Sequence, residues 1–304
     1  MGEESSSLSS ISPKQMRISE LLLVLTTILW GTTFIVTNVL TQMIPPMFYM
    51  GVRYLIAVLG FFPLYPHLKK VTKEHLKIAF IAGTICWISF ATQTIGIKLT
   101  TATKSAFLTG LNILMVPVFV AMIYKKKVPG RIWISTLIAV TGVSVMSFAG
   151  FESVALGDIL VLICDVFYAI YIIYLDNYLK KVEIISFSIL ILAVMSLESF
   201  MASIFFEPIA LIFGESAPVI FTWQNLWIML YMGLVASVGA TLCQNYGQRY
   251  VTSTRAAIIF ALEPLFATFF AVIFGETLEL KTIIGGILII MGIYISIERK
   301  ESKN

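Results

Sequence analysis

QTIGIKLTTATKSAFLTGL, residues 93–111, recurs in modified form as QNYGQRYVTSTRAAIIFAL, residues 244–262. The positions that coincide at this shift of 151 are Gln93/Gln244, Gly96/Gly247, Lys98/Arg249, Thr101/Thr252, Thr103/Thr254, Lys104/Arg255, Ala106/Ala257 and Leu111/Leu262. A second overlay, at a shift of 138, matches the first apolar run to the sixth and pairs Glu20 with Asp158 and Asn38 with Asp176. The chain therefore divides into two related halves.

The composition indicates a chain that is embedded in a lipid membrane. Hydrophobic residues make up 58% and charged residues 12% of the 304 residues, and the mean hydropathy is +0.92. A soluble domain is nearer half apolar and a quarter charged, so a soluble core could not bury this much apolar surface. The three cysteines lie in apolar runs without C-x-x-C spacing. We interpret them as small buried residues and expect no metal site and no cofactor.

Charge-poor runs predict an all-α integral membrane protein with ten transmembrane helices. Helices are the default for these runs because a backbone inside lipid must satisfy its own hydrogen bonds. Residues 1–18 are polar and Ser-rich, which predicts a disordered tail and not a cleaved signal peptide, and residues 299–304 form a second short tail. The predicted spans are 20–41, 46–66, 77–97, 103–124, 132–150, 157–178, 184–206, 224–247, 254–275 and 280–297.

The basic residues predict the orientation of these spans. With ten spans, almost all of the 21 Lys and Arg residues fall in loops on the side of the N-terminus. The exceptions are Lys98, Lys104 and Lys281 on the other side and Arg53 within a span. Positive residues are enriched on the cytoplasmic side of membrane proteins. We therefore expect a multi-pass protein of the cell (plasma) membrane with both termini in the cytoplasm.

The two halves, 19–150 and 151–298, would be inverted repeats. Each holds five predicted helices, and because five is odd the second half enters the membrane from the opposite side. Inverted repeats are typical of secondary transporters, since two similar halves can exchange conformations about a central site. The alternative is a duplication that was retained for packing alone.

Four charged residues lie in the interior of predicted spans, away from the span ends, where a charge is costly unless it faces water or a partner. Glu263 lies near mid-membrane before Pro264, where it could bind an ammonium group, carry a proton, bond exposed backbone at a kink, or pair with Arg53. Arg53 could pair with a carboxylate, orient a substrate carboxylate, or extend toward the membrane surface. Asp165 is a second cavity candidate. The small and polar neighbours of Glu198 suit helix packing and favour a structural or peripheral role for it.

Uncharged polar and aromatic residues complete the candidate substrate-binding set. Gln93 and Gln244 occupy matching repeat positions, and Asn112 matches Glu263. A symmetric role for the two glutamines would be either at the cavity or between helices. Trp30 precedes Gly31 and two threonines and could form a cavity wall or pack in the core. Tyr168 follows Asp165 by one helical turn.

The chain resembles the drug/metabolite transporter superfamily, in its ten-helix EamA-type branch. The stretches that carry the resemblance are ILWGTTFIVTNVL (28–40), FLTGLNILMVPVF (107–119), GDILVLICDVFYAIYIIYL (157–175) and ALEPLFATFFAVIFGETL (261–278). The resemblance covers essentially the whole chain from Ser19 onward. It implies a ten-helix inverted-repeat fold and the export or exchange of small organic solutes such as amino acids or drugs, without indicating which.

These observations favour a secondary transporter that works by alternating access and is not an enzyme. The expected partners are a small-molecule substrate and the lipid bilayer, with protons as a further option. We expect no nucleic acid and either a monomer or a homodimer. An intramembrane enzyme would need histidines or paired aspartates at depth, and a channel would need rings of charge or a filter motif. The predicted spans contain no histidine, and no P-loop motif is present.

Overall fold

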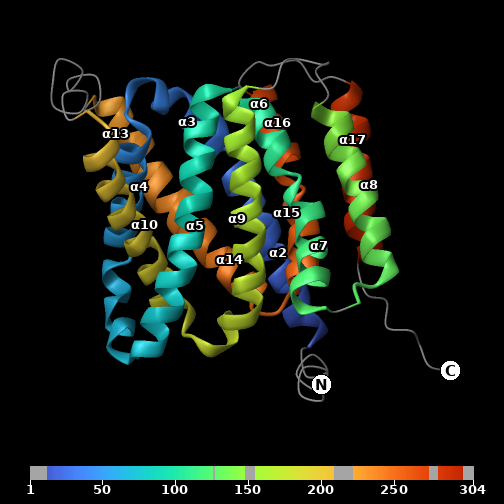
Figure 1. Cartoon of the computed structure of the whole chain (residues 1–304), viewed down its shortest axis with the longest axis horizontal. Helices are drawn as coiled ribbons and strands as arrows, with labels where there is room; N and C mark the ends of the chain where they lie inside the picture. Colours follow the sequence, from blue (N-terminus) through green and yellow to red (C-terminus); the bar gives the residue numbers. More distant parts are fainter. Residues whose placement is uncertain are drawn as a thin grey trace.

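The computed structural model describes residues 12–100, 102–125, 127–147, 155–208, 222–273 and 280–296. Every regular element in these ranges is a helix, and most helices run roughly side by side along one direction (Figure 1). We call the end of the bundle at which α2 begins the proximal end and the opposite end the distal end. Residues 1–11 of the first predicted tail and the whole of the second, residues 299–304, lie outside the described residues.

The helices fall into two groups by the half of the chain that contributes them. The elements of the first half are α2 (Pro13–Gly31), α3 (Thr33–Met43), α4 (Pro46–Gly60), η1 (Phe62–Lys70), α5 (Lys73–Leu99), α6 (Ala102–Thr109), α7 (Asn112–Tyr124) and α8 (Gly130–Ser147). Those of the second half are α9 (Leu156–Tyr178), η2 (Leu179–Lys181), α10 (Ile184–Phe206), α13 (Trp223–Leu230), η3 (Tyr231–Gly239), α14 (Ala240–Gln248), α15 (Ser253–Phe260), α16 (Glu263–Ile273) and α17 (Leu280–Ser296).

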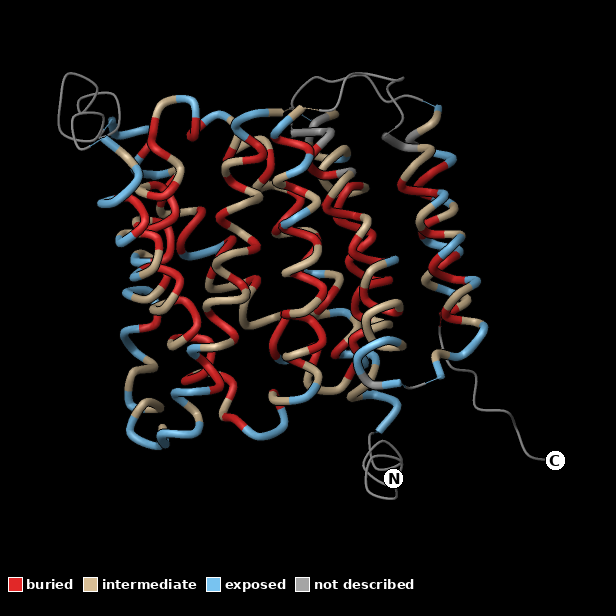
Figure 2. The backbone as a smooth tube through the Cα atoms, in the orientation of Figure 1, coloured by how far each residue is buried: buried red, intermediate tan, exposed pale blue. Residues whose placement is uncertain are grey.

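The protein is an all-α membrane protein. Among the described residues, six helices are long and apolar enough to cross a membrane, or seven if α4 and η1, which are bent by 80°, form one span. Three shorter apolar helices, Asn112–Ile123, Gly130–Val145 and Ile283–Ser296, fall below the length of a full span in that part of the chain. The outer faces expose large apolar side chains such as Phe206, while buried residues line the interior (Figure 2). Lipid is the solvent that suits such a surface.

Two boundaries differ by six or more residues from the sequence-based expectation. The first helix begins at Pro13, inside the stretch expected to be a disordered tail, because Ser12 accepts a hydrogen bond from the backbone N–H of Gln15 and proline suits the first turn. α4, the helix of the second predicted span, ends at Gly60 instead of continuing to residue 66. The chain turns there into the 3₁₀ segment η1, whose two prolines disfavour a continued α-helix.

Two helices are broken at matching positions in the middle of the bundle. α6 and α7 are separated by Gly110 and Leu111, and α15 and α16 by Ala261 and Leu262, which occupy the equivalent positions of the repeat. The backbone bonds at the breaks also match. Gly110 donates to the Ala106 carbonyl and Ala261 to the Ala257 carbonyl, each at 3.3 Å. Pro264 lacks the N–H that would continue the second helix, as its sequence position predicted.

Close helix contacts recur with the same two shifts that relate the sequence halves. A Cβ at Gly96 of α5 would meet the Gly157 carbonyl oxygen at 2.9 Å and the Val161 side chain at 2.7 Å, both on α9. A Cβ at Gly247 of α14 would meet the Ser19 carbonyl oxygen at 2.8 Å and the Leu23 side chain at 2.6 Å, both on α2. The first overlay relates the two glycines, and the second relates their partners. Thus α5 packs on α9 distally as α14 packs on α2 proximally.

A π-helix, η3, accommodates one extra residue in the second half. Gly83 of α5 packs on Val194, and Gly233 of η3 packs on Ile56 in the equivalent contact. The offset between these two glycines is one position shorter than the offset between Gly96 and Gly247, which follow them. α5 is a continuous α-helix over this stretch, whereas η3 is a π-helix. A π-helix is a common way to absorb a single inserted residue and is frequent at functional sites.

α8 and α17 form a pair at one edge of the bundle (Figure 1). Their glycines make reciprocal backbone contacts: a Cβ at Gly142 would meet the Gly285 carbonyl oxygen at 2.6 Å, and one at Gly292 would meet the Ser135 carbonyl oxygen at 2.8 Å. Both glycines therefore allow a backbone approach that a larger residue prevents.

We expect Gly142→Ala to lower the midpoint of thermal unfolding in detergent. Backbone atoms cannot yield as a flexible side chain can, so the added methyl costs about 1–3 kcal/mol of overpacking. Gly130→Ala is the matched control, because a Cβ there meets nothing within 4 Å. It should leave the midpoint unchanged or raise it, since alanine is the better helix former. Equal midpoints for the two variants would contradict this packing.

Candidate functional site

Two small cavities lie side by side in the centre of the bundle. The first is lined by residues of α2, α3, α5, α6 and α9 and by Glu263 at the start of α16. The second is lined by residues of α2, α4, α5, α9, α10, η3 and α14. Trp30 and Phe90 line both. Each cavity measures about 20 Å³, which is enough for a water molecule and too small for an organic solute. In this conformation the centre is closed.

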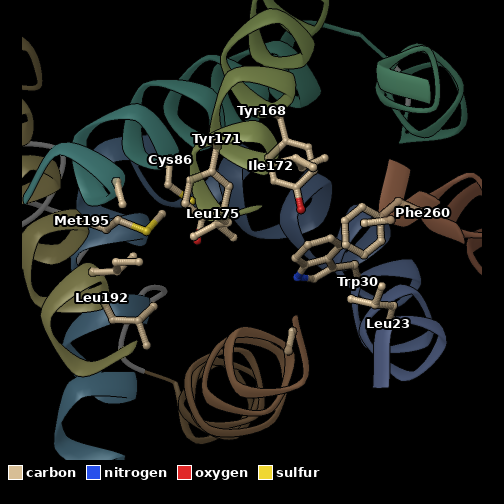
Figure 3. Packing of buried hydrophobic residues seen from close by; sticks show 14 of the residues in the cluster. Leu23, Trp30, Cys86, Tyr168, Tyr171, Ile172, Leu175, Leu192, Met195 and Phe260 are labelled. Carbon is tan, nitrogen blue, oxygen red and sulfur yellow. The ribbon is translucent and has the colours of Figure 1, made fainter. Parts of the chain in front are cut away.

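An aromatic cluster separates the two cavities. Trp30 packs against Tyr168 with ring centroids 5.8 Å apart, against Phe260 at 5.5 Å and against Phe90 at 6.3 Å. Tyr168 in turn lies 5.9 Å from Tyr171. Figure 3 shows Trp30 beside Phe260, with Tyr171 next to Cys86. The second overlay of the sequence matches Trp30 with Tyr168, so the two rings that meet here occupy equivalent positions in the halves.

Glu263 lies at the start of α16, immediately after the helix break. Glu263 is 6% exposed and lines the first cavity. No ion pair with Arg53 exists among the described residues, so that alternative for Glu263 does not hold in this conformation. The break thus presents a carboxyl group to the cavity at the N-terminal end of a half-helix.

Asp165 lies on α9 directly after a residue of the cavity wall but does not itself line either cavity. It is 0% exposed, and neither carboxyl oxygen has a hydrogen-bond partner in the described part of the chain. Its neighbour Cys164 lines the first cavity, whereas Asp165 lines neither. An unbonded, fully buried carboxyl group is costly, which makes a functional role the default hypothesis.

Arg53 lines the second cavity and is 5% exposed. Its Nε donates to Ser237 Oγ at 2.9 Å, and its guanidinium carbon lies 5.5 Å from the centre of the Tyr54 ring. Ser237 belongs to the π-helix, where it also donates to the Met232 carbonyl at 2.8 Å. No carboxylate pairs with Arg53 among the described residues, so a pairing with a carboxylate, which we considered from the sequence, is absent from that part of the structure.

The two glutamines line different cavities. Gln93 lines the first and donates to Thr109 Oγ1 at 3.2 Å, and Gln244 lines the second and donates to the Tyr168 hydroxyl at 3.0 Å. Asn112 lines neither cavity, although it is buried and its Oδ1 has no partner within the described ranges. Six of the eight candidates therefore stand on a cavity wall: Trp30, Arg53, Gln93, Tyr168, Gln244 and Glu263.

Sequence reasoning missed several wall residues on α5. Cys86, Ser89 and Phe90 precede Gln93 at spacings of seven, four and three residues, and all four line a cavity. These spacings place them on one face of a helix, so helical periodicity counted back from Gln93 could have found them. Glu198, outside this site, accepts a hydrogen bond from Thr84 at 2.6 Å, in line with a structural role.

A third cavity lies at the proximal end and is larger, about 300 Å³. Arg17, Glu20 and Arg255 line it together with apolar residues of α2, α15 and α17. Arg255 of α15 pairs with Glu20 of α2. This ion pair joins the first helix of one half to a broken helix of the other, between the centre of the bundle and its proximal end.

Apolar outer faces, helices broken in mid-bundle and buried polar groups at the breaks define a multi-pass membrane protein with an internal polar site. The chain belongs to the EamA-like transporter family, whose model matches residues 17–148 and again residues 155–297. It is a membrane transporter, as are its relatives by name.

An uncharacterized transporter of Archaeoglobus fulgidus is 28% identical over 280 residues, which cover 91% of this chain and 85% of the relative. The uncharacterized transporter YoaV of Bacillus subtilis is 24% identical over a match that covers 89% of this chain and 93% of the relative. A solved crystal structure with 16% identity superposes with a TM-score of 0.74 over 94% of this chain and 99% of that one, which shows a shared fold.

Proposed function

We propose that this protein is a secondary transporter of the cell membrane that moves a small organic metabolite, as an exporter or an exchanger, by alternating access. Its moving units are two inverted five-helix halves, 19–150 and 151–298, and its ten spans leave both termini in the cytoplasm. The proximal end is then cytoplasmic. The matched breaks before Asn112 and Glu263 carry this proposal, because broken helices at mid-membrane are where inverted-repeat transporters bind solutes.

Three further observations support the inverted halves. The family model matches twice, once in each half. The contacts of Gly96 with α9 and of Gly247 with α2 have equivalent partners at opposite ends of the bundle. Gly142 and Gly292 make the same kind of contact in the α8–α17 pair, each against the backbone of the other helix. A two-fold axis in the membrane plane would relate the two halves of the chain in each of these observations. Such symmetry would make inward-open and outward-open states similar in energy.

The closed centre fits a carrier that opens to one side at a time. With cavities of about 20 Å³ each, a solute must displace the aromatic cluster or enter after one end opens. The Glu20–Arg255 ion pair would hold the proximal end shut in this state. Its equivalents in the sequence repeat are Asp158 and Lys104. Asp158 is buried near the distal end and accepts a hydrogen bond from Thr100 at 2.9 Å.

Uptake into proteoliposomes tests the proposal. Solutes are first selected by thermal shift from a metabolite library, because a ligand that binds only the folded state raises the unfolding midpoint. We expect at least one selected solute to enter with saturable kinetics and to exchange with itself, and a pH gradient then reveals whether protons are coupled. Non-saturable flux would favour a channel, and chemical conversion of the solute would favour an intramembrane enzyme.

A further inference from the structure

The cavity at the proximal end carries more positive than negative charge. Arg17 and Glu20 of α2 line it together with Arg255 of α15. Glu20 pairs with Arg255, whereas Arg17 is exposed and makes no ion pair within the described ranges. Two guanidinium groups thus share one carboxylate, and one positive charge is left over. Guanidinium groups bind phosphate oxygens through paired hydrogen bonds, so this excess charge favours a ligand that carries a phosphate.

The residues that line the proximal cavity change from charged to apolar with depth. On α2, Leu21 and Val24 lie one and two turns beyond Arg17, which places them roughly 6 and 10 Å further along the helix from the proximal end. On α15, Ile259 lies one turn beyond Arg255 in the same direction. A phospholipid has the same order, because its phosphate lies at the membrane surface and its acyl chains extend toward the middle of the bilayer.

The walls of the proximal cavity reach the lipid-facing surface of the bundle. Ile18 and Leu21 are exposed on α2, and Ile290 and Tyr294 are exposed on α17, on either side of the lining residue Ile293. Exposed apolar side chains of a membrane protein face lipid, so a lipid chain has access to the cavity from the bilayer. The volume of about 300 Å³ lies at the lower end of the range for ligand pockets, which is roughly 300–1,000 Å³.

We propose that the proximal cavity binds one anionic phospholipid of the leaflet at that end, which is the cytoplasmic leaflet in the orientation proposed above. The phosphate binds Arg17 and Arg255, and an acyl chain packs against Val24, Ile259 and Ile293. Anionic lipids are enriched in the cytoplasmic leaflet, and basic pockets between helices on that side suit their headgroups. A zwitterionic lipid has the same phosphate, but its ammonium group cancels the charge that the cavity selects.

Native mass spectrometry of the delipidated protein in detergent tests the assignment. Phosphatidylglycerol and phosphatidylcholine with identical acyl chains are titrated separately, and we expect the anionic lipid to bind about tenfold or more tightly. Arg17→Gln should weaken binding of phosphatidylglycerol about fivefold and leave phosphatidylcholine unchanged. Lys77→Gln is the matched control, because Lys77 is an exposed basic residue of α5 that does not line the cavity. It should alter neither affinity. Val24→Phe, which fills the apolar part and keeps both arginines, should also weaken binding of phosphatidylglycerol.

Three results would overturn the lipid site. These are equal affinities for the two lipids, undiminished binding of phosphatidylglycerol by Arg17→Gln or Val24→Phe, and displacement of the bound lipid by an equal concentration of glycerol 3-phosphate. The last result would assign the cavity to a soluble phosphate, which has no chain to fill the apolar part. Each variant must first show the unfolding midpoint of the wild type; Arg17→Gln is chosen because Arg255→Gln would also remove the partner of Glu20. Lipid binding is measured without any transported solute, so its failure would leave the transport proposal standing.

Discussion

Glu263→Gln will reduce the transport rate by about a hundredfold at a low solute concentration. The change removes the charge that would pair with the solute, and removal of one partner from a buried charge pair costs about 2–5 kcal/mol. Glutamine keeps the size and hydrogen-bonding ability of the side chain at the start of α16 but removes its charge. A residue that served only to bond the backbone at the helix break would tolerate this change. Initial uptake rates in proteoliposomes, normalised to the amount of reconstituted protein, provide the measurement.

Glu198→Gln is the matched control for this loss. Glu198 is also an acidic residue within an apolar helix, but it bonds Thr84 between α5 and α10, away from both central cavities. Its replacement should leave the transport rate close to that of the wild type. Equal rates for wild type and Glu263→Gln would remove Glu263 from the site, whatever its burial.

Cross-linking the proximal end will stop transport completely and reversibly. Cysteines replace Glu20 and Arg255, whose side chains meet between α2 and α15, and a short bifunctional methanethiosulfonate joins them. In alternating access these helices must separate once in every cycle, so the joined protein cannot complete a cycle. Uptake should fall to the level of empty liposomes and return when a reductant releases the linker.

Two control experiments test whether the loss of uptake comes from the cross-link itself. Each variant with only one of the two introduced cysteines, treated with the same reagent, should retain uptake, because nothing bridges α2 and α15. The charge-reversed double variant, Glu20→Arg with Arg255→Glu, should transport better than either single reversal, because it restores an ion pair. Full uptake by the cross-linked protein would show that the proximal end does not open during transport.

Much of the helix framework follows from apolar runs alone. The predicted span 184–206 coincides with α10, and 157–178 differs from α9 only at its first position. Hydropathy does not reveal where a helix breaks inside the membrane, so the interruption at Thr32 between α2 and α3 was not predicted. Its cause is local: Thr32 and Thr33 turn their hydroxyls onto the carbonyls of Leu29 and Trp30, and this competes with regular helix bonding.

The candidate site was predictable where the repeat or a rare charge marked it. Glu263, Arg53, Gln93 and Gln244 were found in this way, and each lines a central cavity. Asp165 was equally marked by its charge but lines neither cavity, because one residue along a helix turns a side chain by about 100°. The choice between a structural and a functional Arg53 depended on which residues meet it in space, and the sequence does not contain that information.

The accessibility of Cys164 from each side of the membrane tests alternating access most directly. Cys86→Ser and Cys243→Ser leave Cys164, on the wall of the first cavity, as the reporter thiol. The account predicts that a membrane-impermeant thiol reagent labels it from both sides of oriented vesicles. With cysteines at 20 and 255 already cross-linked, labelling should persist only from the side opposite the cross-link. Labelling from one side alone in the free protein, or from both sides in the cross-linked protein, would contradict it.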